Sequence, residues 1–331
     1  MSGPAILVDG LVKRYGDLVA LGGIDFEVKE GSIFGLLGPN GAGKTTAVRI
    51  LSTILQPDGG RAEVLGKDVA GDASAVRRRI GLAGQNAAVD ANLTGRENLR
   101  LVGILGQMPT SQIAPRAADL LARFDLTDAA DRPLRTYSGG MRRRLDIAAS
   151  LMTRPPVLFL DEPTTGLDLT SRNTLWAMIE QLVAEGTTVL LTTQYLEEAD
   201  RLAERIAVVD GGLVIANDTP GQLKAQLGST VVEMRFLGEG RAERATQLLS
   251  GIVGGRVESD DGIVRITAEG GAHILIEVLR ILDGDGLEPE GLTVREPSLD
   301  DVFLSLTGHH AEQDGEGEDV TAPAERGAGA R

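Results

Sequence analysis

The sequence contains no cysteine, which excludes disulfide bonds and thiolate metal sites and fits a reducing compartment. Long apolar runs are also missing. The longest, around residues 157–160 and 189–191, fall well below the roughly 18–20 residues needed to cross a bilayer. No basic and apolar leader begins the chain. We therefore expect a protein that is not secreted and has no membrane span of its own.

Positive charge is scarce, with 33 lysines and arginines against 48 aspartates and glutamates and a net charge of −15. Proteins that bind nucleic acid need clustered cations, so we expect no nucleic-acid partner. Two arginine triplets, Arg77–Arg79 and Arg142–Arg144, have no interleaved aromatic residues. We interpret each as a solvated helix face or a set of local ion pairs rather than a polyanion site.

One stretch carries a complete phosphate-binding motif. Residues 38–45, Gly-Pro-Asn-Gly-Ala-Gly-Lys-Thr, fit G-x-x-x-x-G-K-[ST]. The glycines allow several backbone N–H groups to converge on an anion, Lys44 adds a point charge and Thr45 offers a hydroxyl to Mg²⁺. The apolar run 33–37 predicts a buried strand before the loop, and the apolar spacing over 48–55 predicts a helix after it. The start of that helix would face the phosphates.

Two further stretches place polar groups where ligands bind. Ser138-Gly139-Gly140 precedes a helical apolar pattern, so Ser138 is a predicted N-cap, and the two glycines make either an ordinary cap or a second anion site. Asp161 and Glu162 follow the buried strand 157–160. At the carboxyl end of a parallel sheet, Asp161 suits Mg²⁺ coordination through water and Glu162 suits deprotonation of an attacking water.

The remaining pattern divides the chain into parts. Residues 5–30 alternate as half-exposed antiparallel strands, 86–150 form a helical insert, 187–193 form a buried parallel strand and 206–216 form a hairpin. From residue 229, short strands and helices alternate as in a small α+β domain that ends in an amphipathic helix at 298–308. The tail 309–331 is acidic and poor in apolar residues, so we expect disorder there.

The order of these features resembles the ATP-binding cassette (ABC) ATPases over residues 5–225. Within them, residues 137–144, 192–195 and 298–308 resemble the daunorubicin/doxorubicin resistance exporter subunits. The resemblance implies an α/β P-loop NTPase fold, with a RecA-like core, an antiparallel β subdomain and a helical subdomain, followed by a small C-terminal α+β domain. The implied parts are an ATP-binding domain at 1–228, an accessory domain at 229–308 and the tail.

The same resemblance assigns roles to residues. Tyr15, otherwise a turn-packing residue, would stack on the nucleotide base, Gln85 would sense the metal and the water, and Asp168 would cross a dimer interface. The implied catalytic residues are Lys44, Gln85, Glu162 and Gln194, and the implied metal-binding residues are Thr45, Gln85 and Asp161. The implied nucleotide-binding residues are Tyr15, Gly38, Pro39, Asn40, Gly41, Ala42, Gly43, Lys44, Thr45, Thr46, Ser138, Gly139, Gly140 and Asp168.

The chain departs from the family pattern at two positions. Gln194 stands where the family usually has histidine, and glutamine can donate a hydrogen bond to the γ-phosphate but cannot carry a proton. We therefore expect hydrolysis that persists without an imidazole titration. Met141 stands where the family usually has glutamine, which puts one ribose or phosphate contact in doubt.

The implied cofactors are ATP or GTP with Mg²⁺, because stacking on Tyr15 does not distinguish the bases. The implied assembly is a head-to-tail homodimer that meets a separate transmembrane permease at the cytoplasmic face of the cell membrane. The leading function is the ATPase of a drug or antibiotic exporter. The same engine with another cargo, such as a lipid, a polysaccharide or an ion, is the alternative, and a soluble ABC ATPase acting on ribosomes or DNA is a third. Residues 229–308 would support the dimer or regulate it.

Overall fold

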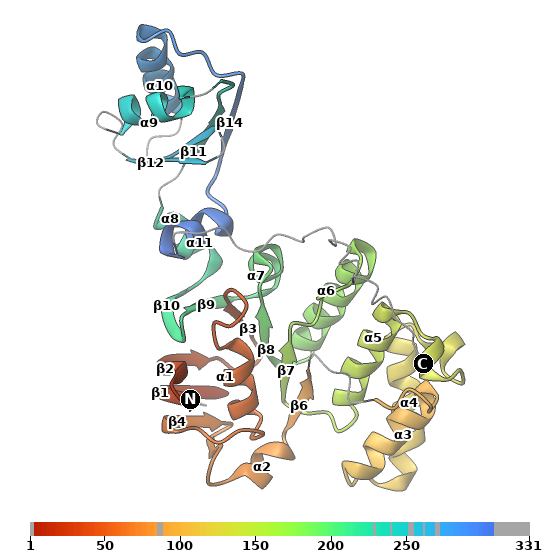
Figure 1. Ribbon diagram of the computed structural model, residues 1–331. Coiled ribbons are helices and arrows are strands. Elements are labelled where there is room, and N and C mark those ends of the chain that lie inside the picture. The colour runs from red at the N-terminus through yellow and green to blue at the C-terminus, as the bar shows by residue number, and fades with distance from the viewer. Residues whose placement is uncertain are drawn as a thin grey trace, which may run out of the picture.

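The computed structural model describes residues 3–84, 89–227, 230–238, 240–250, 255–260, 262–268 and 272–307. These residues form a large part and a small domain that stands apart from it at the top of Figure 1. Three sheets organise the two parts, and two of them belong to the large part.

The first sheet has the strand order β2-β1-β4-β5 and is antiparallel throughout. Its strands are β1 (Ile6–Tyr15), β2 (Leu18–Val28), β4 (Gly59–Val64) and β5 (Lys67–Asp68). Apolar side chains on one face of β1 and β2 are buried, as their alternation requires. The prediction of antiparallel strands over residues 5–30 is confirmed.

The central sheet has the order β10-β9-β3-β8-β7-β6. Its strands are β3 (Ile33–Leu37), β6 (Ile80–Ala83), β7 (Val157–Asp161), β8 (Thr188–Thr193), β9 (Arg205–Asp210) and β10 (Leu213–Asp218). Strands β9, β3, β8, β7 and β6 pair in parallel, and every residue of β3, β7 and β8 is buried. Parallel strands covered on both faces read as continuous apolar runs, which is why the sequence located them correctly.

Alternate residues of the central strands pack in two different hydrophobic cores. Phe34 and Leu36 of β3 pack toward the first sheet, where Phe34 stacks on Phe26 with ring centroids 5.2 Å apart. Ile33 and Leu37 belong to the core on the other face. The period of two along a strand therefore places the central sheet between two layers.

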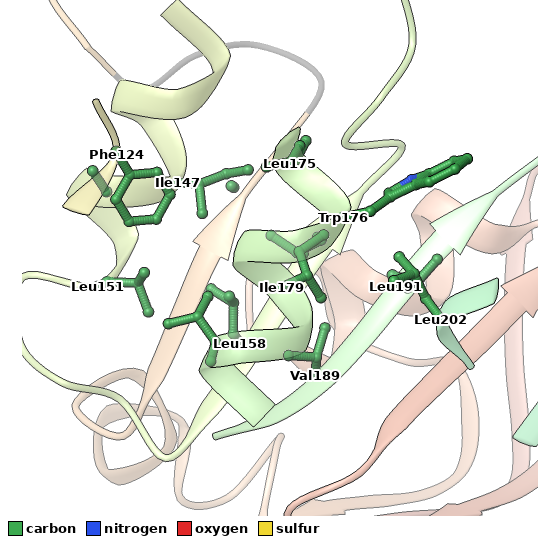
Figure 2. Close-up of a cluster of buried hydrophobic side chains, with 14 of the residues drawn as sticks. Phe124, Ile147, Leu151, Leu158, Leu175, Trp176, Ile179, Val189, Leu191 and Leu202 are labelled. Carbon is green, nitrogen blue, oxygen red and sulfur yellow. The ribbon is translucent and has the colours of Figure 1, made fainter. Parts of the chain in front are cut away.

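The second core joins the central sheet to the predicted helical insert, which is described over residues 89–150 and is called the helical segment below. The helices that contribute are α3 (Gly95–Leu105), α4 (Thr110–Arg123), α5 (Gly139–Ser150), α6 (Leu169–Ala184) and α7 (Leu196–Leu202). Figure 2 shows Phe124 and Ile147 in the same cluster as Leu158 and Ile179. Trp176 is fully buried there.

Helix α1 (Lys44–Leu51) is shorter than the sequence predicted. The apolar spacing extended to Leu55, but the helix ends at Leu51, and Thr53 has a positive φ of 64°. Such a left-handed residue stops a helix, so Leu55 packs on the core from the following turn instead. Helix α2 (Ala73–Arg77) then leads to β6.

The small domain consists of β11 (Thr230–Arg235), α9 (Arg241–Leu249), β12 (Gly255–Asp260), β13 (Ile263–Ala268), α10 (Ala272–Gly284) and β14 (Gly291–Arg295). Its antiparallel sheet has the order β12-β13-β11-β14. This order and the βαββαβ sequence define a ferredoxin-like topology. The prediction of a C-terminal α+β fold is confirmed, whereas the predicted domain bounds of 229–308 stay a prediction.

The last helix, α11 (Leu299–Thr307), leaves the small domain and packs on α7 and α8 (Pro220–Ala225) of the large part (Figure 1). Leu299, Val302 and Phe303 belong to the large core, together with Leu223 of α8. The small domain has a separate core within residues 232–287. The chain thus returns to the large part after building the small domain. The predicted tail 309–331 lies outside the described residues.

Candidate functional site

The phosphate loop runs from the end of β3 to the start of α1. A Cβ at Gly38 would come within 2.1 Å of the Val209 carbonyl oxygen, and one at Gly43 within 2.4 Å of the Ala20 carbonyl oxygen. Gly43 also has a φ of 106°. Both positions therefore require glycine, because the loop is pressed against neighbouring main chain.

The start of α1 provides donors for an anion. Its N-cap is Gly43, which supplies no side-chain cap to the first N–H groups of the helix. Lys44 is only 4% exposed, and its ammonium group donates to the carbonyl oxygens of Gly38 (2.7 Å) and Pro39 (3.0 Å). An uncapped helix start with a lysine folded into the loop fits a phosphate group.

A hydroxyl and a carboxylate meet beside this loop. Thr45 Oγ1 donates to Asp161 Oδ1 at 3.1 Å, and Thr192 Oγ1 donates to the same oxygen at 2.6 Å. Asp161 is 4% exposed. Hard oxygen atoms from one carboxylate and one hydroxyl suit Mg²⁺, which binds few protein ligands and keeps water and substrate phosphates as the others. The residues present therefore fit the predicted metal.

Glu162 stands at the end of β7 in a left-handed conformation, with φ of 48°. This conformation is rare outside glycine, and it is held by the Glu162 N–H, which donates to Thr192 Oγ1 (3.0 Å) and to the Thr192 carbonyl oxygen (3.2 Å). The Glu162 carboxylate lies 3.6 Å from the Lys44 ammonium group. Backbone strain at this residue turns an acidic side chain toward the phosphate loop.

Gln194 follows β8, the strand between β3 and β7. Its Oε1 atom is buried and has no hydrogen-bond partner within the described part of the chain. Leaving a buried amide oxygen unpaired is costly, so the side chain suits a site that a ligand or water completes. The structure thus brings Lys44, Thr45, Asp161, Glu162 and Gln194 to one edge of the central sheet.

The chain is similar to known proteins. A family model described as "ABC transporter" matches residues 21–165. The "Daunorubicin resistance ATP-binding protein DrrA2" of Streptomyces coeruleorubidus is 52% identical, covering 94% of this chain and 98% of that protein. The "Daunorubicin/doxorubicin resistance ATP-binding protein DrrA" of Streptomyces peucetius is 50% identical, over 93% of this chain and 94% of that protein. The chain belongs to this family of ABC transporter ATP-binding proteins.

A solved structure shares the ABC ATPase fold. The dimeric, post-hydrolysis state of the ATP-binding cassette MJ0796 bound to ADP and Pi has a TM-score of 0.60 and 26% identity, and it covers 65% of this chain and 98% of that chain. The predicted fold and family are thereby confirmed. The predicted role of each site residue stays a prediction.

The Ser-Gly-Gly segment of this ABC ATPase lies away from its own phosphate loop. Figure 1 places α1 and α5 on opposite sides of β7 and β8. Ser138 caps α5 by accepting from the Met141 N–H at 3.2 Å, and it is exposed. A Cβ at Gly140 would come within 2.9 Å of Ser171 Oγ, which places the starts of α5 and α6 side by side.

Asp168 caps α6 at this second position. Its carboxylate accepts from the Ser171 N–H at 2.7 Å, and this hydrogen bond is the main cause of a pKa lowered from the usual aspartate value. Asp168 is therefore ionised beside the start of α5 at neutral pH. Two site residues predicted from the sequence, Ser138 and Asp168, thus form a separate exposed group.

The predicted base-stacking residue lies on the first sheet. Tyr15 ends β1 with its side chain 46% exposed, and Lys13 Nζ lies 5.8 Å from the ring centroid. An exposed ring at the end of β1 is available for stacking. Gln85 lies outside the described residues.

Sequence reasoning missed two residues of this ABC ATPase. Thr192 holds both Asp161 and the Glu162 main chain, and its position at the end of a buried strand was the available signal. Arg143 was interpreted as part of a solvated face or of local ion pairs. That interpretation was incomplete, because its side chain is 13% exposed and hydrogen-bonds main-chain carbonyl groups beside the site, in addition to its ion pair with Asp146.

Proposed function

We propose that this chain is the ATP-hydrolysing subunit of an ABC exporter that removes hydrophobic, anthracycline-like drugs from the cell. The convergence of Lys44, Asp161 and Glu162 at the end of the central sheet carries the catalytic part of the proposal. The relatives named for daunorubicin and doxorubicin resistance support the cargo.

The phosphate loop binds the substrate. The backbone N–H groups at the start of α1 and the Lys44 ammonium group hold the phosphates of ATP. Thr45 and Asp161 would hold Mg²⁺, which supplies charge neutralisation at the phosphates when bound. Thr192 fixes the Asp161 carboxylate by a hydrogen bond of 2.6 Å, so its oxygen is oriented before the metal binds.

Glu162 acts as the general base. Its carboxylate accepts the proton of the attacking water, and it lies 3.6 Å from the Lys44 ammonium group beside the bound phosphates. Gln194 orients the water or the γ-phosphate by hydrogen bonds. Because an amide takes up no proton near neutral pH, the proton from the water goes to Glu162 alone.

A second copy completes the site. The exposed helix start at Ser138–Gly140 and its neighbour Asp168 lie apart from the phosphate loop of their own chain, so they suit the nucleotide of a partner in a head-to-tail homodimer. The dimeric state reported for the solved cassette supports this arrangement. ATP then joins the two subunits, and hydrolysis loosens them.

A separate permease would bind on the helical segment. No helix in the described part of the chain is long and apolar enough to cross a membrane. A groove of about 1220 Å³ lies between α2, the α3–α4 connection and the residues that follow α5. Leu105 on this groove is 73% exposed. An apolar side chain so exposed beside a groove suits a protein partner, which would hold this subunit at the cytoplasmic face of the cell membrane.

The test is reconstitution of the full chain with the membrane protein encoded beside it. Inside-out vesicles should accumulate doxorubicin when Mg-ATP is added, and Lys44→Ala should abolish both accumulation and ATP hydrolysis because it removes the charge from the phosphate loop. A matched Lys224→Ala variant should leave both intact, since Lys224 pairs with Asp200 on the surface of α7 and α8. ATP hydrolysis without drug movement would reject the cargo, and wild-type protein without hydrolysis would reject the proposal.

A further inference from the structure

Arg143 lies on α5, five residues after Ser138, and its guanidinium group reaches out of the helical segment into the catalytic edge of the sheet. Nε donates to the Pro163 carbonyl oxygen at 2.8 Å, and Nη2 donates to the Asp161 carbonyl oxygen at 2.9 Å. Nη1 donates to the Gly84 carbonyl oxygen at 2.5 Å. One side chain therefore links α5 to two other segments, the residue that follows β6 and residues 161–163.

The three acceptors flank residues of the proposed reaction. Asp161 and Pro163 lie on either side of Glu162, and Gly84 directly precedes Gln85. The three donors of the planar guanidinium fork have fixed directions, so the main chain around Glu162 and the end of β6 are held at a set distance from α5.

The guanidinium group remains charged in this position. Burial lowers the pKa of Arg143 from its usual value, and the carboxylates of Asp146 and Asp161 oppose that effect. Asp146 lies 3.5 Å from Nη1 and is itself 2% exposed. Since a buried arginine needs partners on most of its donors, the three carbonyl groups and Asp146 together make the position of this side chain well defined.

The neighbouring Arg144 provides a contrast on the same helix. Its side chain is 19% exposed, and Nη1 donates to the Phe124 carbonyl oxygen at 3.0 Å and pairs with Asp125 at 3.2 Å. Both partners lie at the end of α4, within the helical segment. Arg144 therefore stabilises the helical segment, whereas Arg143 connects it to the sheet.

We propose that Arg143 is a positioning residue that couples the helix start at Ser138–Gly140 to the main chain around Glu162. This inference rests on the proposed function, because the nucleotide bound by the partner subunit would contact the start of α5. When that nucleotide docks, α5 and the carbonyl groups held by Arg143 move as one body, so Glu162 reaches its working position only in the closed dimer.

The test compares Arg143→Lys and Arg143→Gln with Arg144→Lys and Arg144→Gln in the full-length chain. Lysine keeps the positive charge but lacks the planar guanidinium group with its several donors, and glutamine lacks both. Both Arg143 variants should therefore lose between about tenfold and a hundredfold in kcat, because small misplacements of a catalytic group have effects of this size. Their KM for ATP should stay within about twofold of wild type. The Arg144 variants should lose thermal stability with kcat nearly unchanged.

A second measurement keeps the test valid if a variant folds poorly. Hydrogen exchange of residues 157–168 should slow when ATP joins two Glu162→Gln subunits, and Arg143→Lys in that background should remove this protection while ATP still binds. Unchanged kcat in both Arg143 variants, or a rise in KM that equals the loss in kcat/KM, would overturn the inference. If wild-type protein hydrolyses no ATP, the proposed function fails instead, so the two failures are distinguishable.

Discussion

The packing of α11 on the large part can be tested by substituting one of its buried side chains. Phe303 is 1% exposed and belongs to the core that contains Leu223 of α8. Replacing a buried phenylalanine by alanine costs about 3–5 kcal/mol, because the transfer free energy is lost and a cavity remains. For a domain of this size, each kcal/mol lowers the midpoint of thermal unfolding by about 2–4 °C, so Phe303→Ala should lower it by about 6–20 °C.

The assay is thermal unfolding combined with hydrogen exchange measured by peptide. In Phe303→Ala, peptides from α7 and α8 should lose protection, while peptides from α9 and α10 should keep it, because the small domain has its own core. Leu249→Ala is the matched control, since Leu249 is fully buried in the small domain and the substitution costs about 2–5 kcal/mol there. If Phe303→Ala exposed α9 and α10 and spared α7 and α8, the assignment of α11 to the large core would be wrong.

Two further predictions concern the site, and a third concerns Glu198, a buried residue of α7. Glu162→Gln should keep ATP binding, lose at least about a hundredfold in kcat and accumulate the ATP-bound dimer, as measured by gel filtration; wild-type turnover would show that another group accepts the proton. Gln194→Ala should lower kcat by about tenfold or more, whereas Gln194→His should restore hydrolysis and add a titration near pH 6.5; unchanged turnover in Gln194→Ala would remove its assignment. Glu198 is fully buried and accepts from Trp176 Nε1 at 3.0 Å, and burial raises its pKa above the usual value of 4.5. A carboxyl group whose pKa is raised in the folded state contributes its full stabilisation below the unfolded pKa of 4.5, and this contribution is lost as the pH rises through the folded-state pKa. Over that range the unfolding free energy of wild type should therefore fall relative to that of Glu198→Gln, by up to about 1.4 kcal/mol per pH unit. A difference in unfolding free energy that stays constant with pH would contradict the assignment.

Several parts of the fold could be predicted because their causes are local. The strands β3, β7 and β8 are buried on both faces, so each appears as an uninterrupted apolar run. Ser138 caps α5, as predicted, with a hydrogen bond from the residue three positions ahead. Short-range geometry of this kind is encoded in the order of neighbouring residues.

Other parts could not be predicted because their partners are distant in the sequence. The end of α1 depends on a left-handed Thr53, which the apolar spacing through Leu55 does not reveal. The amphipathic pattern of α11 predicts a helix, but which of two cores covers it is decided by α7 and α8. In the same way, the sequence does not distinguish Arg143 from Arg144, which are adjacent arginines on one helix. They differ in their hydrogen-bond partners, because Arg143 donates to the Asp161 carbonyl group and Arg144 to the Phe124 carbonyl group.

Residue types at short spacing were enough to locate the phosphate loop, the carboxylates of Asp161 and Glu162 and the buried strands β3, β7 and β8. Three further features emerge only in the packed fold: Thr192 orients Asp161, Glu162 adopts a left-handed backbone, and Arg143 joins α5 to the catalytic edge. The physical reason is that parallel strands bring their carboxyl ends together across more than a hundred residues of chain, as Thr45 and Asp161 do with a sequence separation of 116. Contacts of that range are set by packing of the whole sheet.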